Sequence, residues 1–168
     1  GPPAGPAHKA ELDEYITAFR RHLLCNQLIT KLVLPEMKKS DNGRIVNVIS
    51  TSVKVPLPNL GVSNTIRGAV GNWSKTLANE LGAFGITVNN VLPGATGTGR
   101  LTSIIENKAG KTGKSTDEVS EEMLAEVPLK RFADPSEVAN AVAFLCSPAA
   151  AYISGINLPV DGGRTPSL

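Results

Sequence analysis

Two serines and an arginine stand at short intervals in the middle of this chain of 168 residues. Ser50 ends an apolar run, Ser63 follows thirteen positions later, and Arg67 comes four positions after that. A serine hydroxyl can polarise a carbonyl group by donating a hydrogen bond to its oxygen. An arginine stays protonated near neutral pH, and its forked guanidinium suits a pair of hydroxyl groups. Together these side chains are suited to binding and polarising a carbonyl compound.

A buried strand, a loop and a helix are predicted to hold these side chains. Residues 44–50 form an apolar run rich in Ile and Val, which indicates a strand covered on both faces. Pro and Gly over residues 51–62 predict a loop, and the apolar stripe that follows predicts a helix ending at Leu81. The strand then presents Ser50 at its end, and the helix presents Ser63 near its start.

The rest of the chain alternates helices and strands after an irregular segment over residues 1–7. We predict a helix over 10–37, ended by Pro35 and the polar run that follows it. We also predict strands over 86–92 and 156–160, and helices over 116–125 and from Pro135, capped by Asp134, to Ser147. The polar segment 96–126 directly follows a strand end, which makes it a candidate lid. This order indicates an α/β fold with a parallel sheet, in one domain over residues 1–168.

Composition and charge argue against several classes of function. The net charge of +2 is too small to indicate nucleic acid or an acidic membrane as a partner. No apolar run approaches the roughly 20 residues of a membrane span, and no signal-peptide pattern occurs. Cys25 and Cys146 fall in predicted helices without metal-ligand spacing. We therefore expect buried thiols in a reducing compartment, the cytoplasm, and no metal site.

Four segments resemble, in unbroken order over residues 12–163, the short-chain dehydrogenase/reductase family. They are LDEYITAFRRHLL, GRIVNVIS, ITVNNVLPGATGT and ADPSEVANAVAFLCSPAAAYISGINLPVDGG. They resemble the family's long helix, its strand ending in the catalytic serine, its Pro-Gly loop beside the nicotinamide, and its C-terminal signature. The subgroup that the chain resembles is the 3-oxoacyl-carrier-protein reductases. The resemblance implies the C-terminal half of a Rossmann-like, doubly wound sheet.

The resemblance also implies catalytic roles for four positions, where the family uses Asn, Ser, Tyr and Lys. Ser50 keeps the serine, whereas Ser63 and Arg67 replace the tyrosine and lysine of Tyr-x-x-x-Lys. His22 falls at the asparagine position. A tyrosine pKa of about 10 can be tuned towards neutrality, but a serine is a much weaker acid. Arg67 cannot relay a proton, and His22 could feed one through water.

NAD or NADP is the cofactor that the resemblance implies. Arg67 would hold the ribose, and a loop would approach the nicotinamide through Pro93, Gly94, Thr96 and Thr98. The Gly-rich fingerprint that holds the pyrophosphate in the family does not occur in this sequence. We therefore expect that the nucleotide-binding half is missing from this chain through truncation, proteolysis or an incomplete record, rather than that a gene encodes half a domain.

Each candidate residue also has an ordinary structural interpretation. Ser50 could be a strand-end hydroxyl, and Ser63 could cap its helix. Arg67 could be solvated or ion-paired, and His22 could be an unremarkable helix residue. Thr98 could cap the lid instead of contacting the nicotinamide.

Three functions remain open. The chain could belong to an oxidoreductase acting on a small-molecule carbonyl (3-oxoacyl-like) or alcohol, to an impaired member that binds a dinucleotide or acyl ligand, or to a fragment serving only subunit assembly. Loss of the Tyr-Lys pair favours the second, whereas Ser50, the Pro-Gly loop and the lid favour the first. The resemblance also implies a homodimer or homotetramer formed through helices 10–37 and 64–81, with no nucleic-acid or membrane partner.

Overall fold

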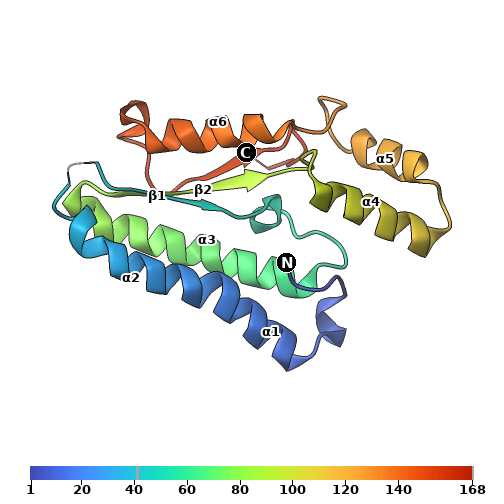
Figure 1. Cartoon of the computed structure of the whole chain (residues 1–168), viewed down its shortest axis with the longest axis horizontal. Coiled ribbons are helices and arrows are strands. Elements are labelled where there is room, and N and C mark those ends of the chain that lie inside the picture. Colours follow the sequence, from blue (N-terminus) through green and yellow to red (C-terminus); the bar gives the residue numbers. More distant parts are fainter. Residues whose placement is uncertain (41, 168) are drawn as a thin grey trace.

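A three-stranded parallel sheet forms the centre of the protein. The computed structural model describes residues 1–40 and 42–167. The strands lie in the order β1 (Arg44–Val48), β2 (Thr87–Pro93) and β3 (Asn157–Val160) (Figure 1). The α/β architecture with three parallel strands is confirmed. The predicted bounds were slightly off, because β1 ends at Val48 and leaves Ser50 in the loop that follows.

Helices cover both faces of the sheet, as expected for strands that are joined by crossovers. One face is covered by α3 (Gly61–Leu81), with α1 (Leu12–Phe19) and α2 (Cys25–Met37) packed outside it, and the other by α6 (Pro135–Cys146) (Figure 1). The central strand β2 is consequently buried along nearly its whole length. This double covering accounts for the apolar runs in the sequence.

The long helix predicted over residues 10–37 forms, but with an irregularity in its middle. A π-helical turn over Arg20–Leu24 separates α1 from α2 and contains His22. The predicted end at Met37 is confirmed, and Pro35 lies inside the last turn of α2. Proline has no backbone N–H and therefore removes one hydrogen bond of the helix. The hydrogen bond that closes the last turn, from the Lys38 N–H to the Leu34 carbonyl, is present at 3.0 Å. A π-helical turn of this kind frequently marks a functional site.

The candidate lid consists of two helices, of which only one was predicted. The helix expected over 116–125 is α5 (Thr116–Ala125), with the predicted bounds, and α4 (Gly99–Thr112) precedes it. Both lie beyond the carboxyl end of β2 (Figure 1). The polar, Gly-rich composition concealed the apolar stripe of α4, which packs as a small core with α5 through Leu101, Ile105, Ala109 and Val119.

Both cysteines are exposed, so the prediction of buried thiols was wrong. Leu145 is fully buried and marks the side of α6 that faces the core. Cys146 follows it directly and therefore points about 100° away around the helix. Cys25 lies on the outer side of α2, beside the exposed Leu24. In the part of the chain described here, no helix is long and apolar enough to cross a membrane.

The start of α6 has the predicted capping arrangement and an added ion pair. Asp134 Oδ1 accepts the Ser136 N–H at 2.8 Å, and Glu137 Oε2 accepts the Asp134 N–H at 2.8 Å. Arg131 donates two hydrogen bonds to the Glu137 carboxylate, at 2.6 and 2.7 Å. The Arg131 bonds, with the Asp134 N–H second, lower the pKa of Glu137 to about 2. The carboxylate therefore stays ionised in the folded protein at mildly acidic pH.

Replacing Glu137 with glutamine should lower the melting temperature at neutral pH, and the deficit should fade in acid. Because the folded pKa of about 2 lies below the ordinary value of 4.5, the stabilisation is present above about pH 4.5. It is lost as the pH falls through about 2. Melting curves of both proteins between pH 7 and pH 2 measure this convergence. As a control, the same change at the exposed Glu106, which has no ion pair with any described residue, should leave the melting temperature unchanged at every pH. A deficit of Glu137→Gln that stays constant at all pH values would contradict the lowered pKa of Glu137.

Candidate active site

Ser50 lies just past the carboxyl end of β1 and caps a short 3-10 turn (Thr51–Val53). Its Oγ accepts the backbone N–H of Ser52 at 3.1 Å. The structural role considered for a strand-end hydroxyl is therefore present. This hydrogen bond uses only an acceptor lone pair of the Ser50 hydroxyl, and the hydroxyl proton is still available for donation. The Ser50 hydroxyl remains able to donate to a ligand at this edge of the sheet.

Helix α3 packs mainly on β2, and one of its side chains reaches β1. Asn47 Nδ2 of β1 donates to Ser74 Oγ at 3.0 Å. Nearer the start of α3, Gly71 lies against Val53, so close that a Cβ added to it would be 3.0 Å from a Val53 methyl carbon. The helix runs opposite to the strand, and residues before Gly71 on the same face therefore extend beyond the carboxyl end of β1.

Arg67 and Ser63 continue this face at successive four-residue steps before Gly71. Arg67 is partly buried, and burial lowers the pKa of its guanidinium. It makes no hydrogen bond or ion pair with any residue in the ranges 1–40 and 42–167. The ion-paired interpretation of Arg67 therefore does not hold within the described structure, and a half-buried cation lies at the end of the strand without a counter-charge.

His22 projects from the π-helical turn into the neighbourhood of Arg67. Its pKa is lowered first by burial, then by the positive charge of Arg67, and further by that of Arg21. The imidazole is therefore mostly neutral at pH 7, because burial and nearby positive charge both disfavour its protonated form. A neutral imidazole is a better proton acceptor than donor near this pH.

Ser63 is not the N-cap of α3, which corrects one of the two interpretations considered for it. The helix begins at Gly61, and Leu60 occupies the cap position. The N-terminal segment provides the missing acceptor, since the Gly5 carbonyl accepts the Gly61 N–H at 3.0 Å. A Cβ at Gly61 would lie 2.4 Å from the backbone of Ala7. This tertiary contact starts the helix early and places Ser63 inside its first turn.

The predicted cofactor loop leaves β2 at Pro93 and is tightly packed. An added Cβ at Gly94 would lie 2.7 Å from Asp161 Cβ, so glycine is required here by packing alone. Thr96 Oγ1 donates to the Gly94 carbonyl at 3.2 Å, and Thr98 Oγ1 to the Thr96 carbonyl at 3.3 Å. Thr98 stands at the cap position of α4, but its side chain makes no capping hydrogen bond. Its hydroxyl therefore stays at the exposed end of the loop.

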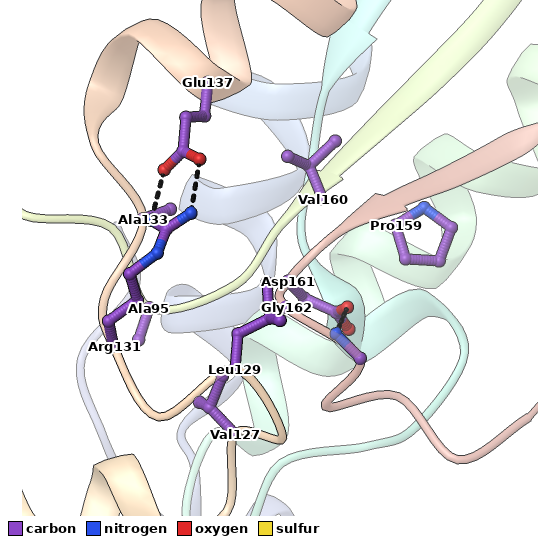
Figure 2. A pocket seen from close by; sticks show the side chains of 11 residues that line it. Ala95, Val127, Leu129, Arg131, Ala133, Glu137, Pro159, Val160, Asp161 and Gly162 are labelled. Carbon is purple, nitrogen blue, oxygen red and sulfur yellow. Dashed lines mark hydrogen bonds and ion pairs between the residues drawn. The ribbon is translucent and has the colours of Figure 1, made fainter.

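The structure contains two cavities that the sequence analysis did not predict. One, of about 250 Å³, lies between the end of β3 and the segment before α6 (Figure 2). Its lining includes Ala95, Leu129, Val160 and Gly162, with the Arg131–Glu137 pair. The other, of about 490 Å³, is a groove between residues 1–3 and α1. Of the candidate catalytic residues, only His22 lines either cavity. Ala95, Glu137 and the turn of Asp161-Gly162-Gly163, which line the first cavity, lie in segments that carried the family resemblance.

The nicotinamide end of a dinucleotide fits the groups at the carboxyl end of β1. Ser52 is 4% exposed, and its Oγ has no hydrogen-bond partner among the described residues. Arg67 likewise lacks a partner, and Ser50 has a proton to donate. A ribose and a carboxamide offer hydroxyl and carbonyl groups that match such donors. No Gly-rich loop that could hold a pyrophosphate occurs in the sequence.

Comparison with known proteins identifies the family. A family model described as "Enoyl-(Acyl carrier protein) reductase" matches residues 1–165. The 7alpha-hydroxysteroid dehydrogenase of Escherichia coli is 32% identical over 169 aligned positions, which cover 98% of this chain. The chain belongs to the short-chain dehydrogenase/reductase family, as its motifs predicted.

Further relatives agree with the subgroup that the sequence resembles. The 3-oxoacyl-[acyl-carrier-protein] reductase FabG of Vibrio cholerae is 41% identical over 137 residues, or 80% of this chain. The crystal structure of a 3-ketoacyl-(acyl-carrier-protein) reductase from Brucella melitensis complexed with NADH superposes with a TM-score of 0.82, at 31% identity over 98% of this chain. This chain spans 62% of the E. coli protein, 51% of the V. cholerae protein and 63% of the B. melitensis chain.

Proposed function

We propose that the full-length protein is an NAD(P)-dependent oxidoreductase that interconverts a carbonyl group and an alcohol, with a 3-oxoacyl-like compound as the substrate. The proposal rests on the placement of Ser50, Ser63 and Arg67 beyond the carboxyl end of β1. In parallel α/β sheets, ligands bind at this edge. The names of the three relatives reported above, each a dehydrogenase or reductase, support the same reaction class.

In this mechanism the protein binds the carbonyl and stabilises the charge that develops on its oxygen. The bound dinucleotide supplies the hydride. Ser50 donates a hydrogen bond to the carbonyl oxygen, and the positive charge of Arg67 favours the developing alkoxide. Arg67 also holds the ribose hydroxyls through its remaining N–H groups. Ser63, at the family's tyrosine position, passes a proton from water to the alkoxide.

A second function is favoured by the substitutions themselves. A serine is a far weaker acid than the family's tyrosine, and an arginine stays protonated and cannot relay a proton. A member with these residues could bind a dinucleotide or an acyl ligand without turning it over. His22, neutral at pH 7, would then be a proton acceptor without a reaction to serve.

The remaining features complete the proposal. The helices α4 and α5 would act as a lid over the substrate, since they follow the Pro-Gly loop directly. The segment from α1 to α2 exposes large apolar side chains, namely Leu12, Ile16, Phe19, Leu24, Leu28, Ile29, Leu32 and Val33. These side chains and α3 would pack against a second copy of the chain in a homodimer or homotetramer. We place the protein in the cytoplasm.

Removing the Ser63 hydroxyl tests the proposed proton path. In the full-length protein, Ser63→Ala should lower the rate of NAD(P)H oxidation with a panel of ketones about 10²-fold, the low end of general acid–base effects. Stopped-flow or steady-state absorbance of the reduced cofactor measures it. Thr65→Ala removes an exposed hydroxyl two residues along α3 and should leave the rate unchanged. Equal rates for wild type and Ser63→Ala would refute this role of Ser63.

A further inference from the structure

The turn that follows β3, over residues 161–164, lies directly against the Pro-Gly loop. The Gly94 N–H donates to the Val160 carbonyl at 2.9 Å, so the loop leaves β2 paired with the end of β3. A Cβ on Gly94 would lie 2.7 Å from the Cβ of Asp161 and 2.8 Å from its Cα. The loop and the turn are therefore in contact, with no room for a side chain between them.

The two glycines of the turn hold the segment that leaves the lid. The Gly162 carbonyl accepts the Leu129 N–H at 3.2 Å, and a Cβ on Gly162 would lie 2.8 Å from a methyl carbon of Val127 (Figure 2). A Cβ on Gly163 would lie 3.2 Å from the Pro128 ring. Both glycines have positive φ angles, 65° and 86°, which residues with a Cβ rarely adopt. The turn thus fits closely against the last residues of the lid.

The carboxylate of Asp161 fixes the shape of this turn. Its Oδ1 accepts the Gly163 N–H at 3.1 Å, and its Oδ2 accepts the Thr165 N–H at 2.9 Å. Hydrogen bonds to a charged acceptor are stronger than those between neutral groups. Between these two points, Arg164 Nε donates to Oε2 of Glu126, the residue that follows α5, at 3.1 Å. Loss of the carboxylate would therefore release the turn at two points.

The lid depends on such contacts at its ends, because its helices pack mainly on each other. Among the described residues, neither α4 nor α5 makes more than slight contact with another helix or strand. At the first end of the lid, the Gly97 N–H donates to the Ala133 carbonyl at 2.8 Å, and the Ala133 N–H donates to the Ala95 carbonyl at 3.0 Å. The turn over residues 161–164 holds the other end.

We propose that Asp161 is a positioning residue, whose carboxylate keeps the turn in the shape that holds the Pro-Gly loop and the end of the lid at a fixed spacing. This inference rests on the proposed function and adds to it a residue that acts through the loop and the lid. Gly94 belongs to the loop that would approach the nicotinamide, and the lid would cover the ketone. Misplacement of reacting groups by about 1 Å costs about 10²-fold in rate.

Replacing Asp161 with alanine in the full-length protein tests this role by kinetics. Asp161→Ala should lower kcat for NAD(P)H oxidation with the same panel of ketones about 10²-fold, with KM nearly unchanged, because the reacting groups are misaligned rather than removed. Asp161→Asn keeps one acceptor oxygen and should recover a large part of kcat. Asp134→Ala is the matched control, because it removes a carboxylate that accepts a backbone N–H, that of Ser136, at the start of α6. It should leave kcat unchanged.

Amide hydrogen exchange measures the same contacts without turnover. The N–H groups of Gly94 and Leu129 donate to the end of β3 and to the turn, so both should exchange about tenfold faster in Asp161→Ala and as in wild type in Asp134→Ala. The proposal is overturned if exchange at either amide stays at the wild-type level, or if Asp134→Ala loses as much kcat as Asp161→Ala.

The two measurements also separate this inference from the proposed function. Turnover by the wild type with an equal kcat for Asp161→Ala would sustain the proposed function and reject the positioning role of Asp161. Faster exchange at both amides of Asp161→Ala, in a protein that oxidises NAD(P)H with no ketone, would confirm that the carboxylate holds the loop and the lid and would reject the proposed function.

Discussion

Replacing Ser50 with alanine should lower kcat/KM for carbonyl reduction by the full-length protein about 10²–10³-fold. This is the usual loss when one preorganised donor to a developing oxyanion is removed. Ser50 is positioned for that role by β1, which ends two residues earlier at the edge of the sheet where the other candidate residues lie. Steady-state rates of reduced-cofactor oxidation measure the effect.

A stability measurement separates this effect from the structural role of the same side chain. The Ser50 Oγ also accepts the Ser52 N–H, so the alanine variant loses one capping hydrogen bond. That loss costs about 1 kcal/mol of stability and should lower the melting temperature by a few degrees only. Ser50→Thr keeps a hydroxyl and should recover a large part of the rate. A rate for Ser50→Ala within threefold of wild type would show that the hydroxyl does not take part in the reaction.

Replacing Asn89 with leucine should lower the free energy of unfolding by about 3 kcal/mol. Asn89 is fully buried in β2. Its Nδ2 donates to the Ile153 carbonyl at 2.8 Å, and its Oδ1 accepts the Ile156 N–H at 3.2 Å. Leucine leaves both backbone groups buried without partners, at about 1–3 kcal/mol each. These two bonds fix the turn that leads into β3.

Urea denaturation of the full-length protein gives the size of this loss. Asn107 supplies the matched control, because it is exposed on α4 and the same change there should alter stability by less than about 0.5 kcal/mol. A loss at Asn89 no larger than at Asn107 would mean that water or a shifted backbone satisfies the groups which leucine leaves behind.

The sequence was sufficient to predict the sheet and most of the helices, because local signals and burial agree there. The Asp134–Glu137 start of α6 is an example, in which cap residues and the apolar stripe point to the same helix. Helix α4 was missed because its apolar residues recur only every fourth position within a polar, Gly-rich surrounding. The two cysteines were misjudged because position in an apolar helix does not say which side faces the core.

The candidate site was predictable in outline but not in its contacts. The parallel topology places the end of β1 beside the start of α3, so the grouping of Ser50 with Ser63 follows from the order of elements. The early start of α3 depends on the packing of Gly61 against the N-terminal segment. The approach of Gly94 to Asp161 is likewise a tertiary contact. Neither leaves a local pattern in the sequence.

Transfer of deuterium from cofactor to product addresses the proposed reaction most directly. The full-length protein would be incubated with NADH or NADPH deuterated on either face of nicotinamide carbon 4, together with the panel of ketones used for Ser63→Ala. The proposed oxidoreductase predicts an alcohol with a single deuterium on its carbinol carbon, delivered from one face of one cofactor. Cofactor that binds but delivers no deuterium to any product would contradict the proposal and leave a dinucleotide-binding protein without turnover.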